Sequence, residues 1–375
     1  MKSILVVFGT RPEVIKLAPV IRALRARPDE VDLCVCSTAQ HREILDDGLR
    51  AFDITPDVDL SLMRENQKLG ELFGRMSSAL HEVFLERKPD IVVVQGDTLT
   101  VMSAAVTAFL DGAEVAHVEA GLRTNDKRQP FPEEANRRLA GVVADYHFAP
   151  TAAAREALLA EGVDGESIRV TGNTGIDSLY WMREQGVADE LPVDLGGRRL
   201  VLVTAHRRES FGEPMREVFH ALREVADRCE DVQLVYPVHP NPNVHGPAHE
   251  LLGDHPRITL TAPLPYPELA SLLLASTLVI TDSGGLQEEA PSVEKPVLVL
   301  REKTERPEAV HAGAARLVGT DRELIVREAT RLLADEAARA EMARHPRLYG
   351  DGLASQRIVE TLLGERATAD FAPEV

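Results

Sequence analysis

The chain has few cysteines and no pattern of metal-ligand spacing. Cys34, Cys36 and Cys229 are its three cysteines among 375 residues. Cys34 and Cys36 lie two apart on an expected strand, where side chains two apart share a face, so we interpret both as small core residues. We therefore expect no bound metal and no disulfide-forming environment, which points to a reducing compartment.

The chain also lacks an excess of positive charge and a long apolar stretch. Its 42 Lys and Arg against 60 Asp and Glu give a net charge of −18, which argues against nucleic acid or an anionic membrane as the main partner. An anionic ligand would have to be held by local cations and helix N-termini. No stretch approaches membrane-spanning length, and residues 1–8 form a first strand rather than a signal peptide. We expect a soluble, cytoplasmic protein.

The Gly-X-Gly-X-X-Gly fingerprint of dinucleotide-binding folds is missing, which weakens any nicotinamide hypothesis. The length nevertheless fits two domains, and apolar runs alternate with helical patterns in the rhythm of an α/β fold. We expect a first domain over residues 1–172 and a second over residues 173–353. The expected strands are residues 3–8, 31–37, 91–94, 115–118, 145–148, 168–171, 200–203, 233–236, 257–261, 278–281 and 296–300.

Three carboxylates lie close to the ends of expected elements in the stretch 95–134. Asp97 and Glu119 follow the apolar runs 91–94 and 115–118, and Glu133 follows Pro132 at the expected start of a helix. Ligands of open α/β sheets bind beyond the carboxyl ends of the strands, so Asp97 and Glu119 should face one crevice. Several acids at one crevice suit proton transfer. The alternative is structural: Asp97 caps the next helix, and Glu133 merely favours a helix N-terminus.

A second group of candidate residues binds anions. Arg11 lies at a strand-to-helix corner, where free backbone N–H groups offer an anion site. Ser283, Gly284 and Gly285 follow a strand and open a helix, so a phosphate can approach the backbone there. Glu289, further along that helix, could accept hydrogen bonds from ribose hydroxyls. The alternative is an ordinary capping turn with Glu289 on the helix surface.

His206 ends a strand and is followed by two arginines, Arg207 and Arg208. A lone histidine there would more often satisfy a backbone carbonyl. The two arginines supply positive charge in an acidic protein, which favours a functional role. His239 is a weaker candidate, because the prolines around it could simply shape a loop.

Taken together, the motifs resemble those of the non-hydrolysing UDP-N-acetylglucosamine 2-epimerases. Each motif is short, but nine occur in one order over nearly the whole chain. They are residues 9–13, 38–41, 95–98, 117–124, 131–137, 206–209, 239–242, 282–291 and 304–308.

The resemblance implies a GT-B-type fold, with two facing Rossmann-like domains and the nucleotide sugar in the cleft between them. It implies that residues 354–375, with the last helix, cross back to the first domain, and that the enzyme is a homodimer. It implies no cofactor. Asp97, Glu119, Glu133 and His206 match the family's catalytic positions. The matches to its UDP contacts, or to positions near the ligand, are Arg11, Ser283, Gly284, Gly285, Glu289, Arg207 and His239.

The implied reaction is reversible conversion of UDP-GlcNAc to UDP-ManNAc. UDP is eliminated to give 2-acetamidoglucal and then re-adds, with a proton delivered to the opposite face of C2. Inversion by this route requires acids or bases on two faces of the sugar, which agrees with several carboxylates. Two other enzymes would share this fold: a hydrolysing epimerase that releases ManNAc and UDP, and a GT-B glycosyltransferase. A non-catalytic nucleotide-sugar sensor would not need the carboxylates.

One departure concerns activation by UDP-GlcNAc, which is common among bacterial members of the family. Gln40 and Gln67 match a candidate effector pocket. However, Glu43 stands where the pattern has a glutamine, and Asn66 stands where a basic residue is common. We therefore expect weak or absent activation by UDP-GlcNAc.

Overall fold

The computed structural model describes residues 1–38, 42–64, 67–344 and 347–373, with the side chains of residues 42–44 left aside. This part of the chain divides into two compact units. Unit 1 contains Met1–Ser178 and Tyr349–Pro373, and unit 2 contains Leu179–Leu348. The chain therefore passes from one unit to the other twice.

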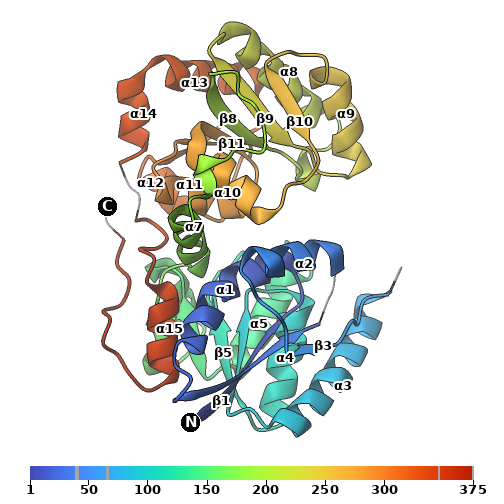
Figure 1. Ribbon diagram of the computed structural model, residues 1–375, viewed down its shortest axis with the longest axis vertical. Helices are drawn as coiled ribbons and strands as arrows, with labels where there is room; N and C mark the ends of the chain where they lie inside the picture. Colours follow the sequence, from blue (N-terminus) through green and yellow to red (C-terminus); the bar gives the residue numbers. More distant parts are fainter. Residues whose placement is uncertain (39–41, 65–66, 345–346, 374–375) are drawn as a thin grey trace. The chain divides into compact units, whose positions relative to one another are not determined.

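Unit 1 is built on a parallel sheet of seven strands within the described residues, in the order β3-β2-β1-β4-β5-β6-β7 (Figure 1). The strands are β1 (Lys2–Phe8), β2 (Val31–Ser37), β3 (Val58–Asp59), β4 (Ile91–Gln95), β5 (Glu114–Val118), β6 (Tyr146–Ala149) and β7 (Ile168–Val170). The helices of this unit are α1 (Arg11–Arg25), α2 (Arg42–Ala51), α3 (Leu69–Arg87), α4 (Leu99–Leu110), α5 (Glu133–Val143), α6 (Ala152–Ala160), the start of α7 (Thr174–Glu184) and α15 (Ala354–Leu362).

Helices cover both faces of this sheet, which explains the unbroken apolar runs in its strands. On β1, Leu5 and Val7 belong to the core cluster formed with α3 and α4. Side chains alternate along a strand, so Ile4 and Val6 face the other side, and they too are fully buried. A parallel strand buried on both faces has no polar alternation, as the sequence predicted for residues 91–94.

Unit 2 repeats the architecture with a parallel sheet of six strands among its described residues, in the order β10-β9-β8-β11-β12-β13. The strands are β8 (Arg199–Thr204), β9 (Val232–Pro237), β10 (Ile258–Thr261), β11 (Ser276–Thr281), β12 (Val297–Val299) and β13 (Ala315–Leu317). The helices are α8 (Glu213–Arg228), α9 (Pro242–Leu252), α10 (Tyr266–Ala275), α11 (Gly284–Ser292), α12 (Pro307–His311), α13 (Arg322–Ala334) and α14 (Glu336–Met342). The prediction of two Rossmann-like α/β domains with parallel sheets is confirmed.

The C-terminal segment belongs to unit 1, where α15 packs against α1. The polar tail beyond it, residues 365–373, is held against the same unit by hydrogen bonds. The backbone N–H of Phe371 donates to the carbonyl of Val170 on the edge strand β7 at 2.9 Å. Arg169 and Arg357, both buried, also donate to tail carbonyls, at Thr368 and Ala369 respectively. Buried guanidinium groups need such acceptors, so they hold the tail in place.

None of the helices in the described ranges is both long and apolar enough to cross a bilayer.

Candidate active site

Glu119 lies directly after strand β5, and two side chains of unit 1 hold its carboxylate. Its φ of 63° is in the left-handed region, which is uncommon for a residue other than glycine. Lys16 on α1 places its Nζ 2.7 and 2.6 Å from the two carboxylate oxygens, and the side-chain amide of Gln95 donates to Oε2. The Glu119 side chain is only 7% exposed. Its carboxylate therefore has one fixed orientation, with a cation beside it.

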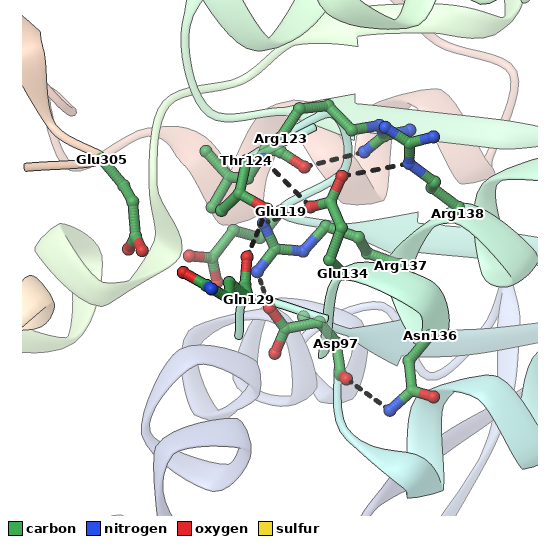
Figure 2. Close-up of polar contacts among 12 residues, drawn as sticks. Asp97, Glu119, Arg123, Thr124, Gln129, Glu134, Asn136, Arg137, Arg138 and Glu305 are labelled. Atoms are coloured by element: carbon green, nitrogen blue, oxygen red, sulfur yellow. Dashed lines mark hydrogen bonds and ion pairs between the residues drawn. The ribbon is translucent and has the colours of Figure 1, made fainter. Parts of the chain in front are cut away.

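Asp97 lies after strand β4, at the same edge of the sheet, because β4 and β5 are parallel neighbours. Its carboxylate forms an ion pair with Arg137 on α5, and its backbone oxygen accepts from the side-chain amide of Asn136 at 2.9 Å (Figure 2). The Asp97 side chain is 30% exposed. The carboxylate is therefore held from the α5 side and still reaches solvent.

The helix-capping alternative for Asp97 is wrong. The N-cap of α4 is Thr98, whose Oγ1 accepts from the backbone N–H of Val101 at 3.3 Å. A threonine in this position satisfies one of the free N–H groups of the first turn, so α4 does not need the Asp97 carboxylate.

Glu133 is the first residue of α5, as predicted. Its Oε2 is buried and has no hydrogen-bond partner among the described residues. Leaving a buried acceptor unpaired costs about 1–3 kcal/mol, and such groups in native proteins call for an explanation. A ligand that brings its own proton donor would satisfy this oxygen.

The turn before α1 differs from the expectation. The backbone N–H groups of Gly9 and Thr10 donate to Oε2 of Glu13 at 3.0 and 2.7 Å. Those two groups are therefore not free to bind an anion, and this part of the prediction is wrong. Burial raises the pKa of Glu13 and lowers that of Arg11. Arg11 itself, the first residue of α1, keeps its position at the corner.

In unit 2, His206 follows strand β8 and faces the buried Asp282, which follows β11. The His206 Nδ1 lies 3.1 Å from Oδ1 of Asp282, while Oδ2 accepts from the backbone N–H groups of His206 and Arg207 at 2.5 and 2.8 Å. Burial raises the pKa of Asp282, but the hydrogen bond and charge of His206 together with the two N–H groups outweigh it, so the pKa is lowered. The strand-capping alternative for His206 therefore does not describe its side chain, whose Nδ1 faces a carboxylate.

His239, the weaker candidate, is brought directly beside His206. The two imidazole rings stack with centroids 5.4 Å apart and planes 6° from parallel. Burial and then the neighbouring His206 lower the pKa of His239. Its Nδ1 accepts from the backbone N–H of Asn241 at 3.1 Å, so the prolines do shape a loop, and the ring is fixed within it.

The glycine turn of unit 2 opens helix α11, with Ser283 as N-cap and no side-chain cap bond. Apart from the chain neighbours and the helix's own backbone, no atom of the part of the chain that the structure describes lies within 4 Å of a Cβ added at Gly285, so the approach to the helix N-terminus is open there. A Cβ at Gly284 would lie 3.1 Å from the guanidinium carbon of Arg306. Gly284 thus lets this cation lie against the first turn of α11. Glu289 on the same helix accepts from the hydroxyl of buried Tyr266 at 3.4 Å.

The predicted effector pocket is only partly described. Gln40 and Asn66 lie outside the described residues, as does the side chain of Glu43. Gln67 has its Nε2 2.6 Å from the sulfur of Met63, and its Oε1 accepts from Arg75.

Four residues that contact the predicted acids and histidine were not singled out from the sequence: Lys16, Gln95, Arg137 and Asp282. Gln95 and Asp282 stand at the carboxyl ends of strands, the same signal that identified Asp97. Arg137 lies four residues after Glu133, which is one helical turn. Lys16 lies inside a helix and carries no comparable signal.

Among the described residues, no group of three or more His, Cys, Asp and Glu side chains could hold a metal ion. These residues form two polar centres, one in each unit. In unit 1, Lys16 and Arg137 lie beside the carboxylates of Glu119 and Asp97. Unit 2 contains the histidine pair and the open N-terminus of α11. The first can move protons, and the second can hold an anion.

The family model described as UDP-N-acetylglucosamine 2-epimerase matches residues 22–363. An Escherichia coli K12 protein named UDP-N-acetylglucosamine 2-epimerase is 49% identical over 373 residues, covering 97% of this chain and 99% of the relative. The Neisseria meningitidis UDP-GlcNAc 2-epimerase, solved with UDP-GlcNAc, is 42% identical with a TM-score of 0.90, covering 97% of this chain and all of that one. Staphylococcus aureus MnaA, solved with UDP, is 42% identical with a TM-score of 0.89, covering 99% and 100%. These whole-chain matches agree with the predicted GT-B-type fold.

Proposed function

The chain belongs to the UDP-N-acetylglucosamine 2-epimerase family, and we propose that it is the non-hydrolysing type, which interconverts UDP-GlcNAc and UDP-ManNAc. The nine ordered motifs support the non-hydrolysing type, and the observation that carries the epimerase chemistry is the set of acids in unit 1. Asp97 and Glu119 are each paired with a cation, and Glu133 has a buried oxygen without a partner within the described ranges. A protein that only binds nucleotide sugars has no need for three such groups.

The chemistry explains why several acids are required. C2–H of the sugar has no adjacent carbonyl, so its proton becomes removable only as the C1–O bond breaks. A carboxylate takes the proton, the electron pair forms the C1–C2 double bond of 2-acetamidoglucal, and UDP leaves with the C1–O electrons. UDP oxygen then re-adds to C1 while a second acid protonates the opposite face of C2. Proton balance between the two faces requires both a base and an acid.

UDP must be stabilised as the leaving anion, and unit 2 supplies the groups for this. Fixed dipoles and cations aimed at developing charge are a large term in catalysis. We assign this role to His206, Arg207 and the N-terminus of α11 at Ser283, Gly284 and Gly285, with His239 beside them. Arg11 of unit 1 is assigned to the diphosphate as well. Glu289, which accepts from Tyr266, is assigned to the ribose hydroxyls.

We also propose that the enzyme is a cytoplasmic homodimer. All three cysteines are free, as in proteins of reducing compartments. The C-terminal part of α4 exposes Leu110 at 74%, and the adjacent helix α5 exposes Leu139 at 49% and Val142 at 83%. Apolar side chains gathered on neighbouring helices are typical of a surface that a partner covers.

Proton NMR of the purified enzyme with UDP-GlcNAc in D2O, without added cofactor, tests the function. We expect UDP-ManNAc with deuterium at C2, because the proton returns from solvent. Free ManNAc and UDP would instead identify a hydrolysing enzyme. Unchanged UDP-GlcNAc would overturn the assignment of the substrate.

A further inference from the structure

We propose that Glu134, a residue with no access to substrate, positions all three catalytic carboxylates at once. The inference rests on the proposed function of those carboxylates. Glu134 follows Glu133 in the first turn of α5, and its side chain is fully buried. It therefore acts through its neighbours and is a positioning residue rather than a catalytic one.

The Glu134 carboxylate receives four donors from separate parts of unit 1. Oε2 accepts from the backbone N–H of Thr124 at 3.0 Å (Figure 2). Oε1 accepts from the backbone N–H of Asn125 at 3.2 Å. Arg138 Nε lies 3.0 Å from Oε1, and Arg137 Nη1 lies 3.3 Å from Oε2. A buried carboxylate is tolerated only when it is paired and hydrogen-bonded in this way, so the four donors are fixed relative to α5.

The first connection runs to Asp97. Arg137 contacts the carboxylates of both Glu134 and Asp97, so one guanidinium group bridges them. Asn136, in the same turn of α5, donates to the Asp97 backbone oxygen. The orientation of Asp97 therefore depends on where Glu134 holds Arg137.

The second connection runs to Glu119. Residues 119–125 form the loop that leads away from β5, and Glu134 binds the two backbone N–H groups at its far end. Glu119 at the near end has a left-handed backbone with φ of 63°, and so has Asn125, also at 63°. Asparagine adopts this conformation readily, but at a glutamate it persists only when surrounding contacts impose it. Glu134 is one such contact.

The third connection is to Glu133 itself. Its carboxylate has an oxygen without a partner among the described residues, so side-chain hydrogen bonds do not fix that oxygen. Its position depends on the backbone at the start of α5. Glu134 anchors that backbone to residues 124 and 125.

The ordinary explanation is that Glu134 only stabilises the fold, as a buried acid in the first turn of a helix does. The two explanations differ in what they predict for kinetics. Loss of stability alone lowers the amount of folded enzyme, whereas misplaced acids lower the turnover of each folded molecule. A displacement of about 1 Å at reacting groups can cost on the order of a hundredfold in rate.

The test uses the full-length enzyme with Glu134→Gln and Glu134→Asp. Glutamine keeps the size of the side chain but replaces one acceptor oxygen by an NH₂ group. That group is itself a donor, so it cannot accept from the donors that surround the Glu134 carboxylate. Aspartate keeps the charge on a shorter arm. We expect kcat for UDP-GlcNAc epimerisation to fall roughly tenfold to a hundredfold in Glu134→Gln, with KM within about threefold and with partial recovery in Glu134→Asp. Hydrogen exchange should accelerate at the amides of Thr124 and Asn125.

Glu360→Gln is the matched control. Glu360 is also a buried carboxylate of unit 1 that is paired with an arginine, Arg169, but it holds the C-terminal tail. We expect Glu360→Gln to lower the free energy of unfolding about as much as Glu134→Gln does, and to leave the kcat of the folded enzyme unchanged. A double-mutant cycle then tests the shared bridge: Glu134→Gln combined with Arg137→Gln should lose less kcat than the product of the two single losses, because both changes disturb the Arg137 contact with Asp97.

Three results would overturn the inference: kcat of Glu134→Gln within about threefold of wild type, equal kcat losses in Glu360→Gln, or multiplicative losses in the double mutant. If Glu134→Gln does not fold, the same cycle is run with Glu134→Asp. Failure of the proposed function is distinguishable, because wild-type enzyme itself would then not form UDP-ManNAc.

Discussion

Lys16 and Glu119 are separated by 103 residues, and the fold brings the ammonium of one within 2.6 and 2.7 Å of the two carboxylate oxygens of the other. The lysine comes from α1 and the glutamate from the loop after β5. Their side chains are 19% and 7% exposed. Charge-assisted contacts of this length are stronger than neutral hydrogen bonds, particularly away from water. The orientation of the Glu119 carboxylate is therefore set by a helix near the start of the chain.

Replacing Lys16 by methionine should lower the turnover of UDP-GlcNAc at least about tenfold, because the Glu119 carboxylate loses its adjacent cation and its fixed orientation. Lys16→Arg should recover part of the loss. Steady-state rates with melting temperatures check this. Lys88→Met, at an exposed lysine, serves as the control, and equal effects of the Lys16 and Lys88 changes would refute the role given to Lys16.

Asp97→Asn and Glu133→Gln should each reduce kcat at least about a hundredfold, which is the usual scale for loss of a general acid or base. Both replacements keep the size of the side chain, so the circular dichroism spectrum should match that of wild type. The measurement is the initial rate of UDP-ManNAc formation. If both variants turn over at nearly the wild-type rate, these residues have no part in the mechanism.

Purified enzyme given UDP-ManNAc alone should begin forming UDP-GlcNAc without a lag, because Glu43 and Asn66 depart from the pattern of activated relatives. Progress curves with and without a trace of UDP-GlcNAc check this. A long lag that the trace abolishes would show that the activating site is intact. The double variant Glu43→Gln, Asn66→Arg should gain such a lag if these two positions are responsible.

The free energy of unfolding should decrease as the pH falls from 6.5 to 4. Burial lowers the pKa of His117 and of His147 to about 4, from an ordinary value of 6.5. Within this window the unfolded chain binds protons that the folded chain excludes, so each histidine removes on the order of 2 kcal/mol by pH 4. Asp177 acts in the opposite direction, because burial raises its pKa to about 6 and its folded form takes up a proton first.

Denaturant unfolding of wild type and His147→Gln at pH 7 and pH 5 isolates the contribution of one histidine. The variant should lose less stability on acidification than wild type. His249→Gln, at an exposed histidine, should behave like wild type. An unchanged pH dependence in His147→Gln would rule out this source of acid sensitivity.

The exposed apolar side chains of α4 and α5 predict where the proposed homodimer has its interface. Val142→Glu combined with Leu110→Glu should convert the dimer to a monomer, because each change would place a charge in a desolvated surface. Light scattering after gel filtration measures this. Leu353→Glu, at an apolar residue 40% exposed outside α4 and α5, is the control. A dimer that survives the double change would place the interface elsewhere.

Much of the fold follows from local patterns in the chain. The buried strands β4 and β5 are continuous apolar runs, and the expected strands 91–94 and 115–118 lie within them. Helices α9 (Pro242–Leu252) and α10 were not predicted, because α9 contains prolines and the apolar run of α10 is short. Strand β13 (Ala315–Leu317) has three residues, too few for a periodic signal.

Site residues at the end of a strand or the start of a helix could be predicted from the sequence. Strand ends and helix starts identified Asp97, Glu119 and Glu133, because position along an element can be read locally. The partners could not be read in this way. Lys16 reaches Glu119, and the Arg137 guanidinium bridges Asp97 and Glu134, only through tertiary packing that no sequence spacing encodes.

The place of the C-terminal tail in unit 1 affects the order in which the two units can finish folding during synthesis on the ribosome. Residues 349–373 complete unit 1, yet they emerge after the whole of residues 179–348, which form unit 2 as one continuous segment. Unit 2 can therefore finish folding first, while unit 1 waits without α15 and without the Phe371 contact on β7. During that interval the outer strand of the first sheet is uncovered, and unpaired strand edges favour wrong pairing between chains. Residues 349–373, translated after unit 2, close that edge.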